Sequence, residues 1–107
     1  MWETAASGFA AMGSEARLRV LKTLVRAGEA GLTVGEIQDK TGIAPSTLAH
    51  HLKFLAAGGL VEQEKIGRTV LNRACYAQLR AMADFILGEC CADAQRADAQ
   101  RKAANDG

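Results

Sequence analysis

Residues 33–57 have the sequence TVGEIQDKTGIAPSTLAHHLKFLAA, and this stretch decides the fold. Its beginning predicts a short helix with Val34 and Ile37 on one apolar face. Gly42 supplies the turn that follows, because glycine adopts positive φ without steric cost. Pro45 is typical of the first position of a helix, where its missing N–H group is not needed. The stretch therefore predicts two short helices joined by a tight turn.

The second of these helices has an apolar side and a polar side. Its apolar stripe consists of Leu48, Leu52 and Leu55, spaced as on one side of an α-helix. Such a helix after a short glycine-containing turn is typical of a helix-turn-helix, whose second helix enters the DNA major groove. An ordinary helical hairpin explains this stretch alone equally well. The other faces carry no acidic side chain, and their polar residues are Ser46, Thr47, His50, His51 and Lys53.

The segment after the second helix favours DNA binding. Residues 60–66 and 69–73 predict two β-strands, and Gly67-Arg68 predicts the tight turn of a β-hairpin between them. The tip carries Lys65 and Arg68, whose charges suit a phosphate backbone. A hairpin directly after a helix-turn-helix is a wing, so the sequence predicts a winged helix-turn-helix, mainly α with a small β-hairpin.

Composition bounds the class of protein. The chain has 107 residues, of which 49% are hydrophobic and 5% aromatic, as expected for one domain of closely packed helices. No apolar run approaches the roughly 18–20 residues that span a bilayer, and the N-terminus has no signal-peptide pattern. We therefore expect a cytoplasmic protein with no membrane contact. The overall charge is +1, but residues 40–73 contain five lysines and arginines against two glutamates, a local charge of +3.

Two further helices are predicted before residue 33. Residues 2–12 form a short one with Trp2, Phe9 and Met12 as its bulky apolar side chains. Residues 15–27 form the next, with Ser14 as the N-cap. The predicted core stripe of this helix consists of Leu18, Leu21, Leu24 and Val25. Its predicted solvated face carries Arg17, Arg19, Lys22 and Arg26.

The last predicted helix, residues 76–91, is apolar around much of its circumference. Such a helix buries more than one face, and in a small domain the second face is expected to meet a partner subunit. We assign residues 1–91 to the DNA-binding and dimerisation domain and expect the polar residues 92–107 to form a mobile tail. The apolar side chains of this helix are Leu79, Met82, Ala83, Phe85, Ile86 and Leu87.

Three segments together resemble the ArsR/SmtB family of small bacterial metalloregulatory repressors. They are SEARLRVL at 14–21, STLAHHLKFL at 46–55 and GGLV at 58–61. The resemblance covers about residues 9–90 and implies a homodimer, formed through the first and last helices, on an inverted-repeat operator in double-stranded DNA. By position it implies that Ser46, Thr47, His50 and His51, with Lys53 beside them, face bases and phosphates, and that Lys65 and Arg68 hold the backbone. The alternative for His51 is a half-buried packing position beside the leucine stripe.

The residues that bind metal at two of the family's known sites are absent from this sequence. The helix before the recognition helix contains no cysteine, and residues 76–95 contain no histidine to bind zinc. The adjacent Cys90 and Cys91 resemble the arsenite-responsive branch, because thiolates are the ligands that soft ions such as As(III) or Sb(III) prefer. Cys75 is a candidate third ligand, reached only across a dimer, since about 22 Å of helix separates it from Cys90 in one chain. We expect no constitutive cofactor.

Other functions fit some of the same residues. The thiols could sense oxidation or persulfide, although a disulfide between sequence neighbours is strained. The cysteines could instead be buried as small hydrophobic side chains, and Cys75 fits that role best. A winged helix used only for protein contacts is a further alternative. No phosphate-binding glycine loop, carboxylate pair or paired Cys and His supports an enzyme.

Overall fold

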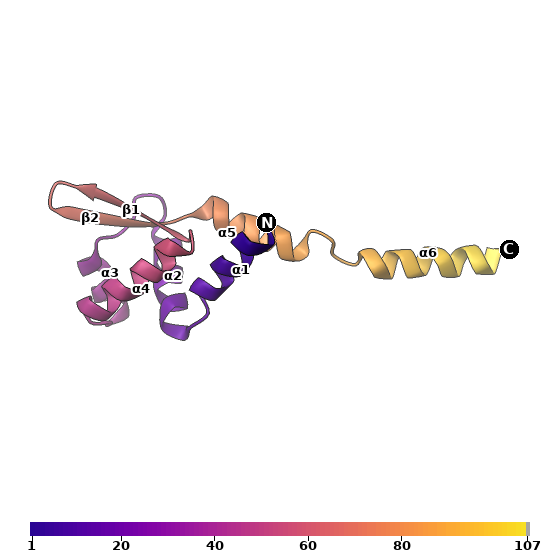
Figure 1. Ribbon diagram of the computed structural model, residues 1–107, viewed down its shortest axis with the longest axis horizontal. Coiled ribbons are helices and arrows are strands. Elements are labelled where there is room, and N and C mark those ends of the chain that lie inside the picture. Colours follow the sequence, from indigo (N-terminus) through magenta and orange to yellow (C-terminus); the bar gives the residue numbers. More distant parts are fainter. Residues whose placement is uncertain (107) are drawn as a thin grey trace.

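The computed structural model describes residues 1–106 and has the predicted architecture (Figure 1). It is mainly helical with one antiparallel hairpin, which confirms the winged helix-turn-helix. No helix in residues 1–106 is long and apolar enough to cross a lipid bilayer. The elements in order are α1 (Trp2–Ala11), α2 (Glu15–Ala27), α3 (Val34–Thr41), α4 (Pro45–Ala57), β1 (Val61–Ile66), β2 (Thr69–Ala74), α5 (Tyr76–Leu87) and α6 (Ala92–Asp106).

Local residues set the ends of the helices as predicted. The Ser14 hydroxyl accepts a hydrogen bond from the Arg17 N–H at 3.1 Å and caps α2. Gly42 ends α3 in the left-handed conformation, with φ 73°, and Pro45 begins α4. Thr33 and Glu36 form a capping box at the start of α3, and these hydrogen bonds with Thr33 hold the pKa of Glu36 below its ordinary value. The turn between α3 and α4 is therefore built from short-range interactions.

The core lies between α2, α3 and α4 and is closed by the start of the wing. Leu48, Leu52 and Leu55 are buried, as the spacing predicted. The predicted stripe of α2 was partly wrong, because Leu18 and Val25 are 45% and 40% exposed. Both lie on one flank of the helix, while the fully buried side is formed by Val20, Leu21 and Leu24.

The wing is joined to the helices through Asn72, the one buried polar residue in the part of the chain that the structure describes. Strands β1 and β2 pair from Val61↔Ala74 to Ile66↔Thr69, and Asn72 also forms an antiparallel bridge with Leu32 in the loop before α3. Its side-chain amide donates to the Leu32 carbonyl at 3.2 Å and accepts from Gln63 Nε2 at 2.8 Å. This network fixes the base of the wing against the helix-turn-helix.

Replacing Asn72 with alanine is expected to cost about 1–3 kcal/mol of unfolding free energy, because the buried side chain no longer donates to the Leu32 carbonyl or accepts from Gln63. Urea unfolding followed by circular dichroism measures this. Gln63→Ala, which removes only the outer member of the network, is the control and should cost less. A change below about 0.5 kcal/mol for Asn72→Ala would show that the wing is held by other contacts.

The C-terminal part of the chain differs from the prediction for residues 76–91. Helix α5 leaves the wing, runs beside α1 and ends at Leu87 rather than at residue 91 (Figure 1). Glycine weakens helices, and Gly88 interrupts this one. Helix α6 then projects away from the other elements, and the side chains of residues 92–104 are exposed. That this tail is mobile stays a prediction.

Candidate nucleic-acid interface and thiol pair

The outer face of α4 presents polar side chains without a negative charge. Ser46, Thr47, His50 and Lys53 are exposed, because the leucine stripe on the opposite side of α4 fills the core. Hydroxyl, imidazole and ammonium groups bind phosphates and base edges in DNA. The predicted recognition residues, apart from His51, therefore share one accessible surface.

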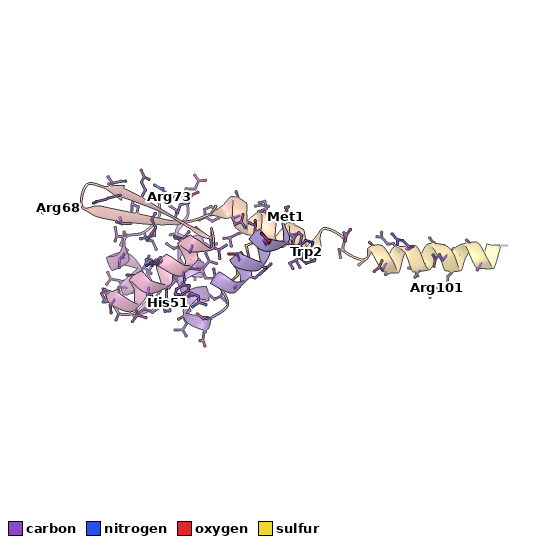
Figure 2. All side chains as sticks on the ribbon, in the orientation of Figure 1. Met1, Trp2, His51, Arg68, Arg73 and Arg101 are labelled. Carbon is purple, nitrogen blue, oxygen red and sulfur yellow. The ribbon has the colours of Figure 1, made fainter. Side chains whose placement is uncertain are left out.

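The two adjacent histidines have different surroundings. His50 is exposed, and its ring stands edge-on to Phe54, with centroids 4.9 Å apart and planes at 77°. His51, labelled in Figure 2, is half-buried according to its exposure, and its buried Nδ1 atom has no hydrogen-bond partner among the described residues. His50 is thus the imidazole most open to a base or phosphate, and His51 has the half-buried position that the sequence left open.

The tip of the wing carries two exposed cations. Lys65 lies near the end of β1, and Arg68 follows Gly67, whose positive φ of 64° makes the turn. Figure 2 shows Arg68 at the far end of the hairpin from α5. Arg73, on the same hairpin, pairs instead with the Glu64 carboxylate and donates to the Glu29 carbonyl at 2.9 Å. Lys65 and Arg68 are therefore the wing cations placed for an external partner.

Cys90 and Cys91 are exposed and lie in the connection between α5 and α6. The prediction that they end the last helix was wrong, because the chain leaves α5 at Gly88. The Cys90 N–H donates to the Leu87 carbonyl at 2.8 Å, and Cys91 takes a positive φ of 63°. Their sulfur atoms are 3.4 Å apart, so both thiols face the same small volume.

Cys75 lies far from this pair along the chain. It is half-buried between β2 and α5, beside a hollow of about 320 Å³ that Glu62 and Tyr76 also line. The whole of α5, about 18 Å long, separates it from Cys90. Within residues 1–106, no three His, Cys, Asp or Glu side chains of one chain gather as a metal site. A third sulfur from Cys75 therefore requires a second subunit.

An apolar surface remains uncovered where α1 meets the end of α5. The Trp2 and Phe85 rings stand edge to face with centroids 4.8 Å apart, yet Trp2 is 79% exposed. Ile86 and Leu87 are each 63% exposed beside them. We call these four residues the apolar end. It has the composition of an interface core rather than of an ordinary surface.

Comparisons with known proteins agree with this geometry. A family model described as a helix-turn-helix domain matches residues 12–64. The transcriptional activator HlyU of Vibrio cholerae is 32% identical over 76 residues, which are 71% of this chain and 68% of HlyU. An ArsR-like transcriptional regulator from Rhodococcus sp. RHA1 is 32% identical, with a TM-score of 0.75 over 96% of this chain and 93% of the other. The chain belongs to the ArsR family.

A further relative, described as a possible ArsR-family transcriptional regulator, has been solved as a homodimer. It is the homodimeric winged helix-turn-helix domain of Mb0332 from Mycobacterium bovis, 27% identical with a TM-score of 0.65 over 82% of each chain. Members of the ArsR family are DNA-binding transcriptional regulators and not enzymes. This ArsR-family chain therefore carries a transcriptional regulator's helix-turn-helix, with α4 as its recognition helix.

Sequence reasoning missed two residues that link the elements of this ArsR-family domain. Arg17 was placed on a solvated face, but it is half-buried, and its Nε donates to the Ala11 carbonyl at 2.5 Å. Asn72 looked like an ordinary strand residue. Neither role has a sequence pattern, because both depend on how separate elements pack: Arg17 of α2 bonds the end of α1, and Asn72 of β2 bonds the loop before α3.

Proposed function

We propose that this ArsR-family protein is a homodimeric repressor, released from an inverted-repeat operator when As(III) or Sb(III) binds Cys90 and Cys91. The observation that carries the proposal is the exposed thiol pair, with sulfurs 3.4 Å apart, directly beside the apolar end of α5. An effector bound there touches the element expected to hold the two subunits together.

The apolar end supports the homodimer. Trp2, Ile86 and Leu87 are large side chains on two helices of the same region, and water contact with them is unfavourable. A second copy of the same surface covers them in an isologous, two-fold interface, which suits an inverted repeat. The homodimeric Mb0332 domain supports the same assembly.

The thiol pair supports a soft, thiophilic effector. Thiolate sulfur is the preferred ligand of soft ions, and each As–S bond forms as an arsenite hydroxyl group leaves as water with the proton of the thiol. Cys90 and Cys91 supply two sulfurs from one chain. The third position is filled by the Cys75 of the partner subunit, by a small thiol or by water. The positive φ of Cys91 goes with sulfur atoms that are 3.4 Å apart, close enough to bind one ion together.

Effector binding and DNA binding are coupled through thermodynamic linkage. The Cys90 N–H is bonded to the carbonyl of Leu87, so an ion held by Cys90 constrains the last turn of α5 at the apolar end. A changed subunit orientation no longer matches the half-site spacing of about 34–36 Å. The effector then binds the DNA-free form more tightly, by the factor by which it weakens DNA binding.

The DNA-binding part of the proposal is tested by the salt dependence of binding to a duplex selected from a random-sequence pool. Lys65→Gln with Arg68→Gln is expected to weaken binding and to reduce the slope of log K against log salt by about 0.9 for each phosphate that the wing no longer neutralises. Lys102→Gln on α6 is the control and should leave the slope unchanged. An unchanged slope in the wing variant would exclude the wing tip from the interface, and no binding to any duplex by the wild type would favour a protein-interaction module.

A further inference from the structure

Arg17 connects three helices through one guanidinium group. It belongs to α2, yet its Nε donates to the Ala11 carbonyl at 2.5 Å and its Nη2 to the Ala10 carbonyl at 3.4 Å. These carbonyls lie at the C-terminal end of α1, where the helix dipole favours a positive charge. Arg17 therefore holds the end of α1 against α2.

The same guanidinium also contacts the recognition helix. Its central carbon lies 5.2 Å from the centroid of the Phe54 ring on α4, within range of a cation–π interaction. The Phe54 ring in turn meets His50, the exposed histidine of the DNA-facing surface. A continuous set of contacts thus runs from α1 through Arg17 and Phe54 to His50.

Elsewhere α1 approaches α4 and α5 closely at glycine positions. A Cβ atom at Gly58, just after α4, would lie 2.4 Å from the Cβ of Ala11. A Cβ atom at Gly8 would lie 2.6 Å from the Met82 sulfur on α5. The contacts at these glycine positions are close but non-directional packing contacts. The hydrogen bonds and the cation–π contact of Arg17 add a directional constraint between α1, α2 and α4.

We infer that Arg17 is a positioning residue that sets the angle of the recognition helix α4 relative to α1. The inference rests on the proposed homodimer, in which α1 is part of the subunit interface. The DNA-facing start of α4 is about 18 Å from Gly58, so a rotation of about 10° there moves Ser46 by about 3 Å. When both recognition helices of a dimer are displaced in this way, their separation no longer matches the spacing of two half-sites. A single half-site binds one recognition helix and therefore tolerates the displacement.

The test compares two duplexes of equal length, one with the selected inverted repeat and one with a single half-site. Arg17→Gln is expected to lower affinity for the inverted repeat by about tenfold and affinity for the single half-site by less than about twofold. Arg19→Gln, an exposed arginine two residues away on the same helix, is the matched control and should change neither. Circular dichroism confirms that each variant is folded.

If Arg17→Gln does not fold, Arg17→Lys keeps the positive charge but loses the paired N–H donors to the Ala10 and Ala11 carbonyls, and should give the same selective decrease in affinity. Equal decreases on the two duplexes, or no decrease on either, would overturn the positioning role. A wild type that shows no preference for the inverted repeat would overturn both this inference and the homodimer on which it rests. The two failures are distinguishable, because only the second is visible without any variant.

Discussion

Serine at both Cys90 and Cys91 is expected to lower the affinity of the reduced protein for arsenite by at least about 100-fold. A hydroxyl oxygen is a poor ligand for a soft ion, and the pair is the only place in residues 1–106 where two cysteine sulfurs of one chain come together. Isothermal titration of the reduced protein without DNA measures this directly. Serine keeps the size and exposure of the side chains, so the fold should not change.

Cys75→Ser is the matched control for that measurement. It leaves the pair intact and removes only the half-buried thiol at the other end of α5. A lower affinity in this variant would assign the third sulfur to the partner subunit, and an unchanged affinity would exclude the shared site. Undiminished arsenite binding by the Cys90/Cys91 variant would contradict the thiol pair itself.

The second large effect is expected from Ile86→Asp. In the proposed dimer the side chain at position 86 is buried in the subunit interface. An unpaired carboxylate buried there costs several kcal/mol of dimerisation free energy. The dimer should therefore dissociate, and operator affinity should fall by about 100-fold or more, because each subunit then binds one half-site alone. Sedimentation equilibrium gives the oligomeric state, and fluorescence anisotropy with the selected duplex gives the affinity.

Asp84→Lys is the control on the same helix. Residues two positions apart on an α-helix point about 160° away from each other, so Asp84 faces away from Ile86. This change alters the charge of an exposed residue and should leave the dimer intact. A dimer that survives Ile86→Asp would place the subunit interface elsewhere.

Most of the fold could be predicted because its boundaries depend on neighbouring residues. Gly42, Pro45 and Ser14 act within one turn of their own position, and the leucine stripe of α4 has an unambiguous helical period. The wrong predictions concern features that depend on contacts between residues far apart in the sequence. Leu18 fits the same period as the true core of α2 but lies on a flank where it stays 45% exposed in one chain.

The candidate site was predictable in part for the same reason. Exposed polar residues of α4 and the cations of the wing tip follow from helical and hairpin geometry. The link from Arg17 to Phe54 and the network of Asn72 could not be foreseen, because their partners are 37 and 40 residues away in sequence. The predicted end of α5 was wrong because the helical spacing of apolar residues continues past Gly88, whereas the helix itself ends at Leu87.

The most direct test of the proposed function is an arsenite titration of the reduced wild-type protein bound to its selected inverted-repeat duplex, followed by fluorescence anisotropy. We expect release of the DNA by the wild type and none by the Cys90→Ser/Cys91→Ser variant. A wild-type complex that stays intact at arsenite concentrations that saturate the protein would contradict the coupling between the thiol pair and α4. Persulfide and mild oxidants would then be the next effectors to titrate.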